Sequence, residues 1–522
     1  MTVQQRTYRP GDMVDAVVVG TGAGGAPVLA RLAQAGLEVV ALEAGREWSP
    51  ADDFATDEVE QNKLFWLDER ISDGANPLMF GKNNSGIGVG GSTLHYTAYT
   101  PRPQPDDFRL QREFGVGVDW PIGYDDLEPY FTELEAFLGV SGPAHYPWGP
   151  PRSPYPLAPL PLNGAAQLMQ GACERLGIRT SPAANAALSA PWHQPGYELR
   201  PACTNRGFCQ AGCSTGAKAS MDVTFVPLAR SYGAEVRSGC FVTGFERDAA
   251  GAITAVVYTQ DGIDQRQRCR NVFLCAGAIE TPRLLLINGL ANSSGQVGRN
   301  FMAHTGMQVW GQFGQAIRPY KGIPGALISE DTHRPVNADF AGGYLLQSIG
   351  VMPVTYAGEV ARGRGLWGDA LRRHMRGYNH VAGINILGDC LPSPDNFVEL
   401  SDEIDGRGLP KPRSHFTAGQ NERRLHAHAE ALMRCIWEEA GASDLWSFER
   451  YAHTIGTCRM GDTAADAVVD AECRSFDVPN LLICDNAVFP SALAANPALT
   501  IMAVALRAAD LFLARNARGD LQ

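Results

Sequence analysis

The sequence has little charge and no long apolar run. Charged residues make up 19% of its 522 residues, and 44 Lys and Arg against 56 Asp and Glu give a net charge of −12. A nucleic-acid-binding protein needs a basic face against the phosphates, so this balance argues against one. Membrane insertion is not expected either, because no apolar stretch is as long as a spanning helix. Residues 1–15 lack the apolar core and cleavage site of a signal peptide, so we expect a cytoplasmic protein.

The chain is long enough to bury its own core without disulfide bonds. Its length corresponds to roughly two to four domains at ~150 residues each. Twelve cysteines in a cytoplasmic protein are expected to be reduced thiols or metal ligands. No internal repeat interrupts this globular pattern. Glycine is abundant, with 57 residues, which indicates many places where the backbone approaches a ligand or another element closely.

The N-terminal segment has the pattern of a strand, a glycine turn, a helix and a second strand. The apolar residues 16–20 predict a buried parallel strand, and residues 26–36 carry apolar side chains at helical spacing. Between them lies a G-x-G-x-x-G motif made by Gly20, Gly22 and Gly25. A second apolar run ends at Glu43. This arrangement is typical of a dinucleotide-binding fold, with the helix N-terminus facing the pyrophosphate and the acid accepting hydrogen bonds from a ribose diol.

Four further segments combine glycines, small residues and polar groups, as around a large planar cofactor. They are Asn83–Pro103, Phe273–Leu286, Ala452–Asp462 and Ile483–Asp510. Together with the first glycine motif, the sequences GVGGST, CAGAIETPRLLL, HTIGTCRMG and DNAVFPSALAANPALTIMA resemble the glucose–methanol–choline (GMC) flavoprotein oxidoreductases. The five motifs occur in the family's order and reach both ends of the chain. Residues 301–422 carry few of its signatures.

The resemblance implies a mixed α/β fold of two domains. A Rossmann-type domain that binds FAD would consist of residues 1–100, 196–300 and 451–522. A substrate-binding domain with an antiparallel sheet and helices would consist of residues 101–195 and 301–450. The latter includes a proline-rich connection, Ser141–Leu162, which cannot form regular helix or sheet.

The resemblance also implies which residues hold FAD. Gly20, Gly22 and Gly25 would contact the pyrophosphate, and Glu43 the adenosine ribose. The loop Gly90, Gly91 and Ser92 would lie beside the pyrophosphate and isoalloxazine, and Val242 beside the adenine. Asp485 and Asn486 would meet the ribitol region. Pro497 and Thr500 would lie at a helix N-terminus by the pyrimidine edge, where the helix dipole stabilises an anionic reduced flavin.

Two residues match the catalytic pair of the family. They are His453 in the H-x-x-G-T motif and Asn496 about forty residues later. Oxidation of an alcohol moves a hydride from carbon to the flavin while a base takes the hydroxyl proton. A neutral imidazole suits that role, whereas an amide can donate or accept a hydrogen bond but cannot titrate. We therefore expect His453 to be the base.

Two features leave alternatives open. His95 stands where some family members attach FAD covalently through histidine; we expect a non-covalent flavin, with a link through His95 as the alternative. Cys203, Cys209 and Cys213 have the spacing C-x5-C-x3-C. This spacing resembles both sugar dehydrogenases with a 3Fe–4S cluster and long-chain alcohol oxidases. The neighbouring TNRGF and STGAK favour the second group and a structural, thiol-lined loop. No other metal site is predicted.

The expected function is FAD-dependent oxidation of a CH–OH group. The substrate would be sugar-like, an amino sugar (aminoglycoside) or a polyol, which also agrees with the polar residues Asn379, His380, Asn385 and Asp389 in the middle region. Oxygen or another acceptor would take the electrons. A long-chain alcohol is an alternative substrate. Other hypotheses are a lyase of the hydroxynitrile type with non-redox FAD, and an electron-transfer subunit without its own substrate.

Overall fold

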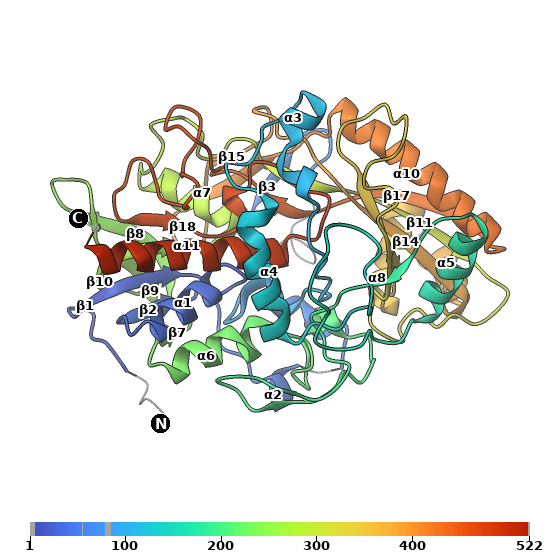
Figure 1. Ribbon diagram of the computed structural model, residues 1–522, viewed down its shortest axis with the longest axis horizontal. Helices are drawn as coiled ribbons and strands as arrows, with labels where there is room; N and C mark the ends of the chain where they lie inside the picture. Colours follow the sequence, from blue (N-terminus) through green and yellow to red (C-terminus); the bar gives the residue numbers. More distant parts are fainter. Residues whose placement is uncertain (1–5, 55, 79–84, 520–522) are drawn as a thin grey trace.

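The computed structural model describes residues 6–54, 56–78 and 85–519. Asn83 and Asn84, at the start of the second predicted motif, lie outside these ranges. Two large β-sheets lie next to each other along the long axis of the molecule, and helices cover both (Figure 1). Within the described ranges, no helix combines the length and apolar character needed to cross a bilayer.

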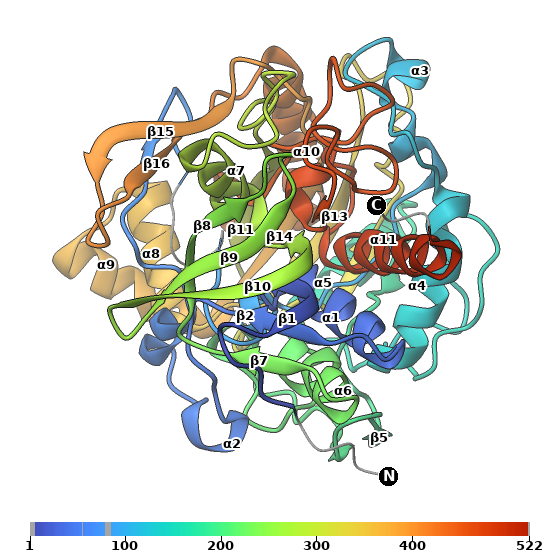
Figure 2. The ribbon, with the colours of Figure 1, turned by 90° about the vertical axis from the view of Figure 1, so that its left-hand side faces the viewer.

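The first sheet contains the predicted strand–turn–helix unit. Its strands run in the order β7 (Glu235–Arg237), β2 (Val39–Leu42), β1 (Met13–Val19), β10 (Ile263–Leu274), β9 (Ile253–Gln260) and β8 (Phe241–Arg247), and β18 (Leu481–Ile483) also pairs with β10. β1 is parallel to both of its neighbours, with Ala16 opposite Val39 and Asn271. The apolar run of β1 is buried because a parallel sheet is covered on both faces. Figure 2 shows this sheet turned towards the viewer.

Helices from distant parts of the chain pack around this sheet. They are α1 (Gly25–Gln34), α4 (Tyr124–Leu138), α6 (Phe225–Ser231), α7 (Gly277–Ile287) and α11 (Ala498–Arg518). α1 contacts both α6 and α11, and α11 in turn packs on α4. The apolar residues of α1 line up at helical spacing, so eight of its ten residues are buried.

The second sheet is antiparallel and forms the other half of the molecule. Its strand order is β17 (Ser443–Ile455), β11 (Met302–Gln312), β14 (Val381–Gly388), β13 (Tyr344–Ile349), β12 (Leu327–Ser329) and β4 (Ser181–Pro182). α5 (Gly164–Arg175) and α10 (Gln420–Glu439) pack on one face. Successive residues of a strand face opposite sides, so Val309 lies under Trp437 of α10 while Trp310 packs on Tyr356 of α8 (Pro353–Arg364).

The remaining elements are short. Strands β15 (Phe397–Ile404), β16 (Pro410–His415) and β3 (Ile71–Asp73) form a third sheet, and β5 (Trp192–His193) pairs with β6 (Leu199–Arg200). The other helices are α2 (Pro50–Asp53), α3 (Leu110–Phe114) and α9 (Gly368–Met375), with 3₁₀ turns η1 (Val59–Leu64), η2 (Gly91–Leu94), η3 (Pro105–Phe108), η4 (Cys209–Ala211), η5 (Met221–Val223), η6 (Tyr378–His380) and η7 (Asn486–Val488). Residues 142–162 of the proline-rich connection contain no helix and no strand.

The predicted mixed α/β fold class is confirmed, with a Rossmann-type sheet and a separate antiparallel sheet. The exact domain segments stay a prediction. β17 begins at Ser443, before the boundary expected at residues 450 and 451, and carries His453 from the second sheet towards the first.

Candidate active site

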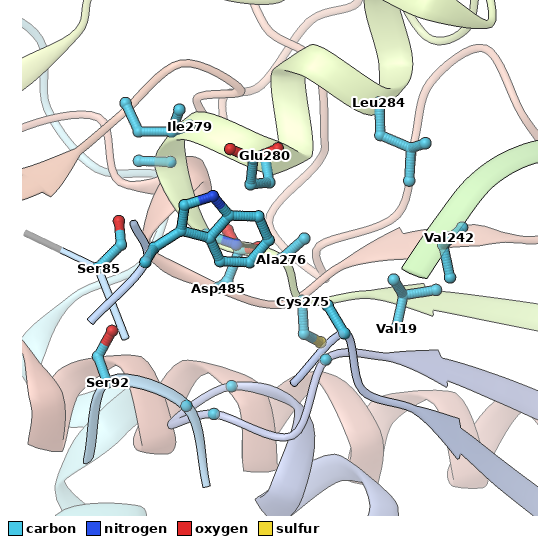
Figure 3. Close-up of a pocket in the computed structure, with 18 of the residues that line it drawn as sticks. Val19, Ser85, Ser92, Val242, Cys275, Ala276, Ile279, Glu280, Leu284 and Asp485 are labelled. Atoms are coloured by element: carbon cyan, nitrogen blue, oxygen red, sulfur yellow. Dashed lines mark hydrogen bonds between the residues drawn. The ribbon is translucent and has the colours of Figure 1, made fainter. Parts of the chain in front are cut away.

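A cavity with an empty volume of about 1190 Å³ opens at the carboxyl ends of β1 and β10. Ligands bind at this edge in parallel α/β sheets. Several of the residues predicted to hold a cofactor line this cavity: Gly20, Gly22, Glu43, Gly91, Ser92, Val242, Asp485 and Asn486. Figure 3 shows Val242 at one end, beside Val19 and Leu284, and Ser85 with Ser92 at the other. The cavity is therefore elongated, as an extended dinucleotide requires.

The two glycine motifs meet at this cavity, and they leave no room for side chains. A Cβ on Gly25 would lie 2.0 Å from the carbonyl oxygen of Gly20, and one on Gly91 would lie 2.7 Å from the Cα of Gly22. Gly90, next to Gly91, joins the two motifs by a hydrogen bond: its amide donates to Thr21 Oγ1 at 3.1 Å. Gly24, which the motif does not specify, is packed as tightly, because its Cβ would lie 1.9 Å from the carbonyl oxygen of Cys484.

Glu43 is buried under the same turn and is already fully hydrogen bonded. Its Oε2 accepts from the amide and the hydroxyl of Thr21, and its Oε1 accepts from the amides of Gly45 and Gly88. Burial nevertheless raises the pKa of the carboxyl group above its ordinary value. A carboxylate offers about four acceptor positions. In this structure Glu43 therefore holds the glycine turn together, and its predicted bond to a ribose stays a prediction.

Asp485 and Asn486 connect the cavity to three elements. Asp485 Oδ2 accepts from Gly277 N and Thr281 Oγ1, both at 2.7 Å, which joins the N-terminus of α7 to the end of β18. Burial raises the pKa of Asp485 against these bonds. Asn486 donates from Nδ2 to the carbonyl oxygen of Thr454 on β17. Both side chains thus reach the cavity from a well-fixed position.

The first turn of α11 reaches the cavity at Ile501, which follows directly after Thr500. Pro497 is the N-cap of this helix, and the Oγ1 atom of Thr500 is buried without a hydrogen-bond partner among the described residues. Neither residue lines the cavity itself. The glycine contacts and the elongated shape of the cavity fit an FAD molecule.

His95 lies behind the glycine loop and does not line the cavity. Its ring packs on Phe65 with 4.7 Å between ring centroids, and its Nε2 atom is buried with no partner in the part of the chain that the structure describes. Burial, with the nearby Lys218, lowers its pKa to about 3. His95 is thus a neutral, buried imidazole, and the expected non-covalent flavin stays a prediction.

A second cavity adjoins the first at the end of β17. Ala452 and His453 line the second cavity, and the next residue, Thr454, lines the first. Asn496 also lines the second cavity. The structure therefore brings the two predicted catalytic residues into one cavity, and His453 lies next to the residue that lines the other cavity.

His453 is the extra residue of a β-bulge. β17 pairs with β11 so that Ala303 faces Thr454 and His304 faces Ala452, which leaves His453 without an opposite residue. Its backbone has φ +57°, an uncommon conformation for a histidine. Bulges re-aim side chains in this way. Burial, with the nearby His304, Arg450 and His95, holds the pKa of His453 well below its ordinary value, so the imidazole is neutral.

His304 is a residue of this site that the sequence did not reveal. It lies in β11, lines the second cavity and packs edge-on against His453. Its Nε2 atom is 2.9 Å from the carbonyl oxygen of Leu493, three residues before Asn496. The alternation of side chains in residues 302–312 places His304 on the same face as Gln308, but no motif marks either residue.

Three side-chain amides form a row across the floor of the second cavity. Gln308, Asn385 and Gln347 lie opposite one another on the neighbouring strands β11, β14 and β13, and all three line the cavity. Of the polar middle-region residues taken as a sign of a sugar substrate, only Asn385 is part of this floor. Asn379 and His380 belong to η6, and Asp389 is buried outside the cavity. These three residues lie outside the row because β14 begins at Val381 and ends at Gly388.

The cysteine segment forms one wall of the second cavity. Gly207, Phe208, Gln210 and Ala211 line it, between the predicted thiols. The buried Lys218 holds this segment against the glycine loop, because its Nζ donates to the carbonyl oxygens of Leu94, Tyr96 and Cys209.

The three thiols differ in their surroundings. Burial raises the pKa of Cys203, and it raises that of Cys209 to about 12. Burial acts on Cys213 in the same direction, but hydrogen bonds from the Lys218 amide and the Thr215 hydroxyl outweigh it and lower the pKa. The choice between a structural loop and a cluster stays a prediction.

Family models and full-length relatives place this chain in the same protein family. Two family models described as GMC oxidoreductase match residues 79–306 and 392–505. The chain is 30% identical to the fructose dehydrogenase large subunit of Gluconobacter japonicus, over 96% of this chain and 97% of that one. It is 31% identical to the 2-methyl-1,2-propanediol dehydrogenase of Mycolicibacterium austroafricanum, over 96% and 95%.

Solved structures show the same fold at low identity. The crystal structure of pyridoxine 4-oxidase from "Mesorbium loti" superposes with a TM-score of 0.67 at 18% identity, covering 96% of this chain and 99% of that one. With the two family models and the full-length relatives, this chain belongs to the GMC oxidoreductase family, whose members bind FAD, and it is an enzyme that acts on the CH–OH group of an alcohol.

Proposed function

We propose that this enzyme oxidises one hydroxyl-bearing carbon of a sugar-like, amino-sugar or polyol substrate, with His453 as the base. The observation that carries the proposal is that His453 and Asn496 line one cavity, while Thr454, next to His453, lines the elongated cavity. FAD would lie in the elongated cavity, held by the glycine turns and by the Asp485 region. When bound, it supplies the acceptor for a hydride from the substrate carbon.

His453 is suited to take the hydroxyl proton. Its Nδ1 atom is enclosed without a partner among the described residues, so Nε2 is the nitrogen through which the imidazole reaches the cavity. The lowered pKa keeps the ring neutral and able to accept a proton at neutral pH. The bulge in β17 fixes the direction of the ring. Asn496 would hold the substrate oxygen, and the carbon that loses the hydride would face the flavin cavity.

The amide row supports a substrate with several hydroxyl groups. Trp310, Asn496 and bonds within the row use part of the hydrogen-bonding capacity of these amides, and their remaining N–H and carbonyl groups can pair with hydroxyls. A long alkyl chain would leave such groups without partners, at a cost in binding free energy. Relatives whose names include fructose, a propanediol and paromamine agree with this class.

The test is anaerobic mixing of the purified flavoprotein with a panel of polyols, sugars, amino sugars and long-chain alcohols. Bleaching of the flavin band by the hydroxyl-rich compounds is expected. Fast bleaching by long-chain alcohols alone would select the alternative substrate. An unchanged spectrum across the panel would overturn the proposal in favour of a lyase or an electron-transfer subunit. Comparison of oxygen with an artificial dye then identifies the electron acceptor.

A further inference from the structure

Gln347 makes a short contact with the second residue of the predicted catalytic pair. Its Nε2 donates to Oδ1 of Asn496 at 2.6 Å, and both side chains are buried. Gln347 lies in the middle of β13, while Asn496 lies in the loop before α11. The contact therefore links the floor of the second cavity to the loop that carries Asn496.

A third amide is oriented consistently with the direction of this hydrogen bond. Asn385 lies opposite Gln347 on β14, and its Nδ2 donates to Oε1 of Gln347 at 3.5 Å. Since the carbonyl oxygen of Gln347 is used in this way, its NH₂ group is turned towards Asn496. The chain of bonds runs from Asn385 through Gln347 to Asn496, and in it each amide donates to the next.

The consequence concerns which atoms of Asn496 meet the substrate. An amide has one acceptor oxygen and two N–H donors. Oδ1 of Asn496 is committed to Gln347, while Nδ2 has no hydrogen-bond partner among the residues that the structure describes. Asn496 thus presents donors to the cavity. A substrate oxygen that accepts from Nδ2 keeps its own proton free to point at His453.

We propose that Gln347 is a positioning residue, which makes Asn496 a hydrogen-bond donor to the reacting oxygen. The inference rests on the proposed function. As the hydroxyl loses its proton, negative charge grows on the oxygen, and a donor already directed at that oxygen stabilises the transition state more than the ground state. If Asn496 turned Oδ1 to the substrate instead, two oxygen atoms would face each other as the negative charge grows, and the same step would be slower.

The first test is Gln347→Glu, which keeps the shape but allows the hydrogen bond to reverse. The ionised carboxylate of this variant can only accept, so it would draw Nδ2 of Asn496 away and turn Oδ1 to the substrate. We expect flavin reduction to slow by at least about tenfold. At lower pH the new carboxyl group becomes protonated and can donate again, so the ratio of the variant rate to the wild-type rate should rise.

The matched control is Gln308→Glu, which places the same charge in the same cavity. The Oε1 atom of Gln308 accepts from Trp310, and among the described residues Gln308 makes no hydrogen bond to Asn496. The other ionisable groups facing the cavity are common to both variants: His304, His453, Arg450, Glu359, Glu58 and Tyr99. If both variants show the same pH-dependent ratio, the effect is one of general charge and the positioning role is wrong.

The second test is a double-mutant cycle with Gln347→Leu and Asn496→Ala. If Gln347 acts through Asn496, Gln347→Leu should slow flavin reduction in the wild type but cause no further loss in the Asn496→Ala background. Losses that multiply independently would overturn the inference while the proposed function stands. If no alcohol bleaches the wild-type flavin, the proposed function fails and the inference fails with it. Flavin absorbance per chain confirms that each variant is folded.

Discussion

His304 and His453 lie edge-to-face, with 5.2 Å between their ring centroids and an interplanar angle of 83°. One ring comes from the regular strand β11 and the other from the bulge of β17. Since burial keeps both imidazoles neutral, the pair can stand side by side without charge repulsion. His304 also hydrogen bonds to the carbonyl oxygen of Leu493, in the loop that carries Asn496. It therefore contacts both His453 and the Asn496 loop.

Replacement of His453 should remove the base and leave the fold intact. We expect His453→Ala to lower the rate of flavin reduction by roughly two to four orders of magnitude, the range for loss of a general base. Asn496→Ala should lower it by less, since it removes one hydrogen bond to the substrate oxygen. Stopped-flow measurement of flavin bleaching gives both rates. A near-normal rate in His453→Ala would place the base elsewhere.

The pH dependence of the reaction should reflect the lowered pKa of His453. The base works only when neutral, and it is neutral at every pH above its pKa. The rate of flavin reduction should therefore be flat through neutral pH and fall only below the ordinary histidine value of about 6.5. In His453→Ala the acid fall should disappear. A fall centred at or above pH 6.5 in the wild type would contradict this environment for His453.

His304 should make the protein sensitive to acid. Burial lowers its pKa to about 4 in the folded state, whereas an unfolded histidine takes up a proton near 6.5. Between these values the unfolded state binds more protons, so the free energy of unfolding falls as pH decreases, by at most about 3 kcal/mol for this group. His304→Phe should lose less stability between pH 7 and pH 4.5.

Thermal unfolding at several pH values measures this effect. The exposed His193 provides the control, because His193→Phe should leave the pH dependence unchanged. If His304→Phe and the wild type lose equal stability on acidification, groups other than His304 determine the pH dependence of unfolding.

Asp389 should lower the stability of the folded protein as pH rises, whereas His304 lowers it as pH falls. Burial, with the charge of Asp107, raises its pKa to about 7, far above its unfolded value. Between about pH 4 and pH 7 the folded state binds more protons, so this group lowers stability as pH rises. Asp389→Asn should therefore raise the Tm relative to the wild type more at pH 8 than at pH 5. The exposed Asp395 gives the matched control, Asp395→Asn, for which no such difference is expected.

Cofactor attachment and metal content can be read from one preparation. Acid precipitation should release yellow FAD, because His95 is packed on Phe65 behind the glycine loop. Iron should be well below one equivalent per chain, since Lys218 and backbone contacts already hold the cysteine segment. A yellow pellet that becomes colourless in His95→Ala, or stoichiometric iron with a broad visible absorption, would reverse these expectations.

The local patterns of the sequence predicted the strand–turn–helix–strand unit of the first sheet. β1, the glycine turn and α1 follow from apolar spacing and from contacts that only glycine permits, so neighbouring residues determine them. The family motifs likewise marked His453 and Asn496, because each stands within a local pattern of its own.

The second cavity depended on tertiary structure. Gln308, Asn385 and Gln347 are ordinary polar residues in three distant segments, and only the register of the antiparallel strands places them in one row. The bulge at His453 depends on its pairing with β11, and the role of Gln347 depends on a loop about 150 residues further along the chain. Such contacts leave no spacing in the sequence, because strand register is fixed by packing between segments rather than by neighbours. The sequence determined the glycine turn and the predicted catalytic pair, and the tertiary structure decided what surrounds and orients them.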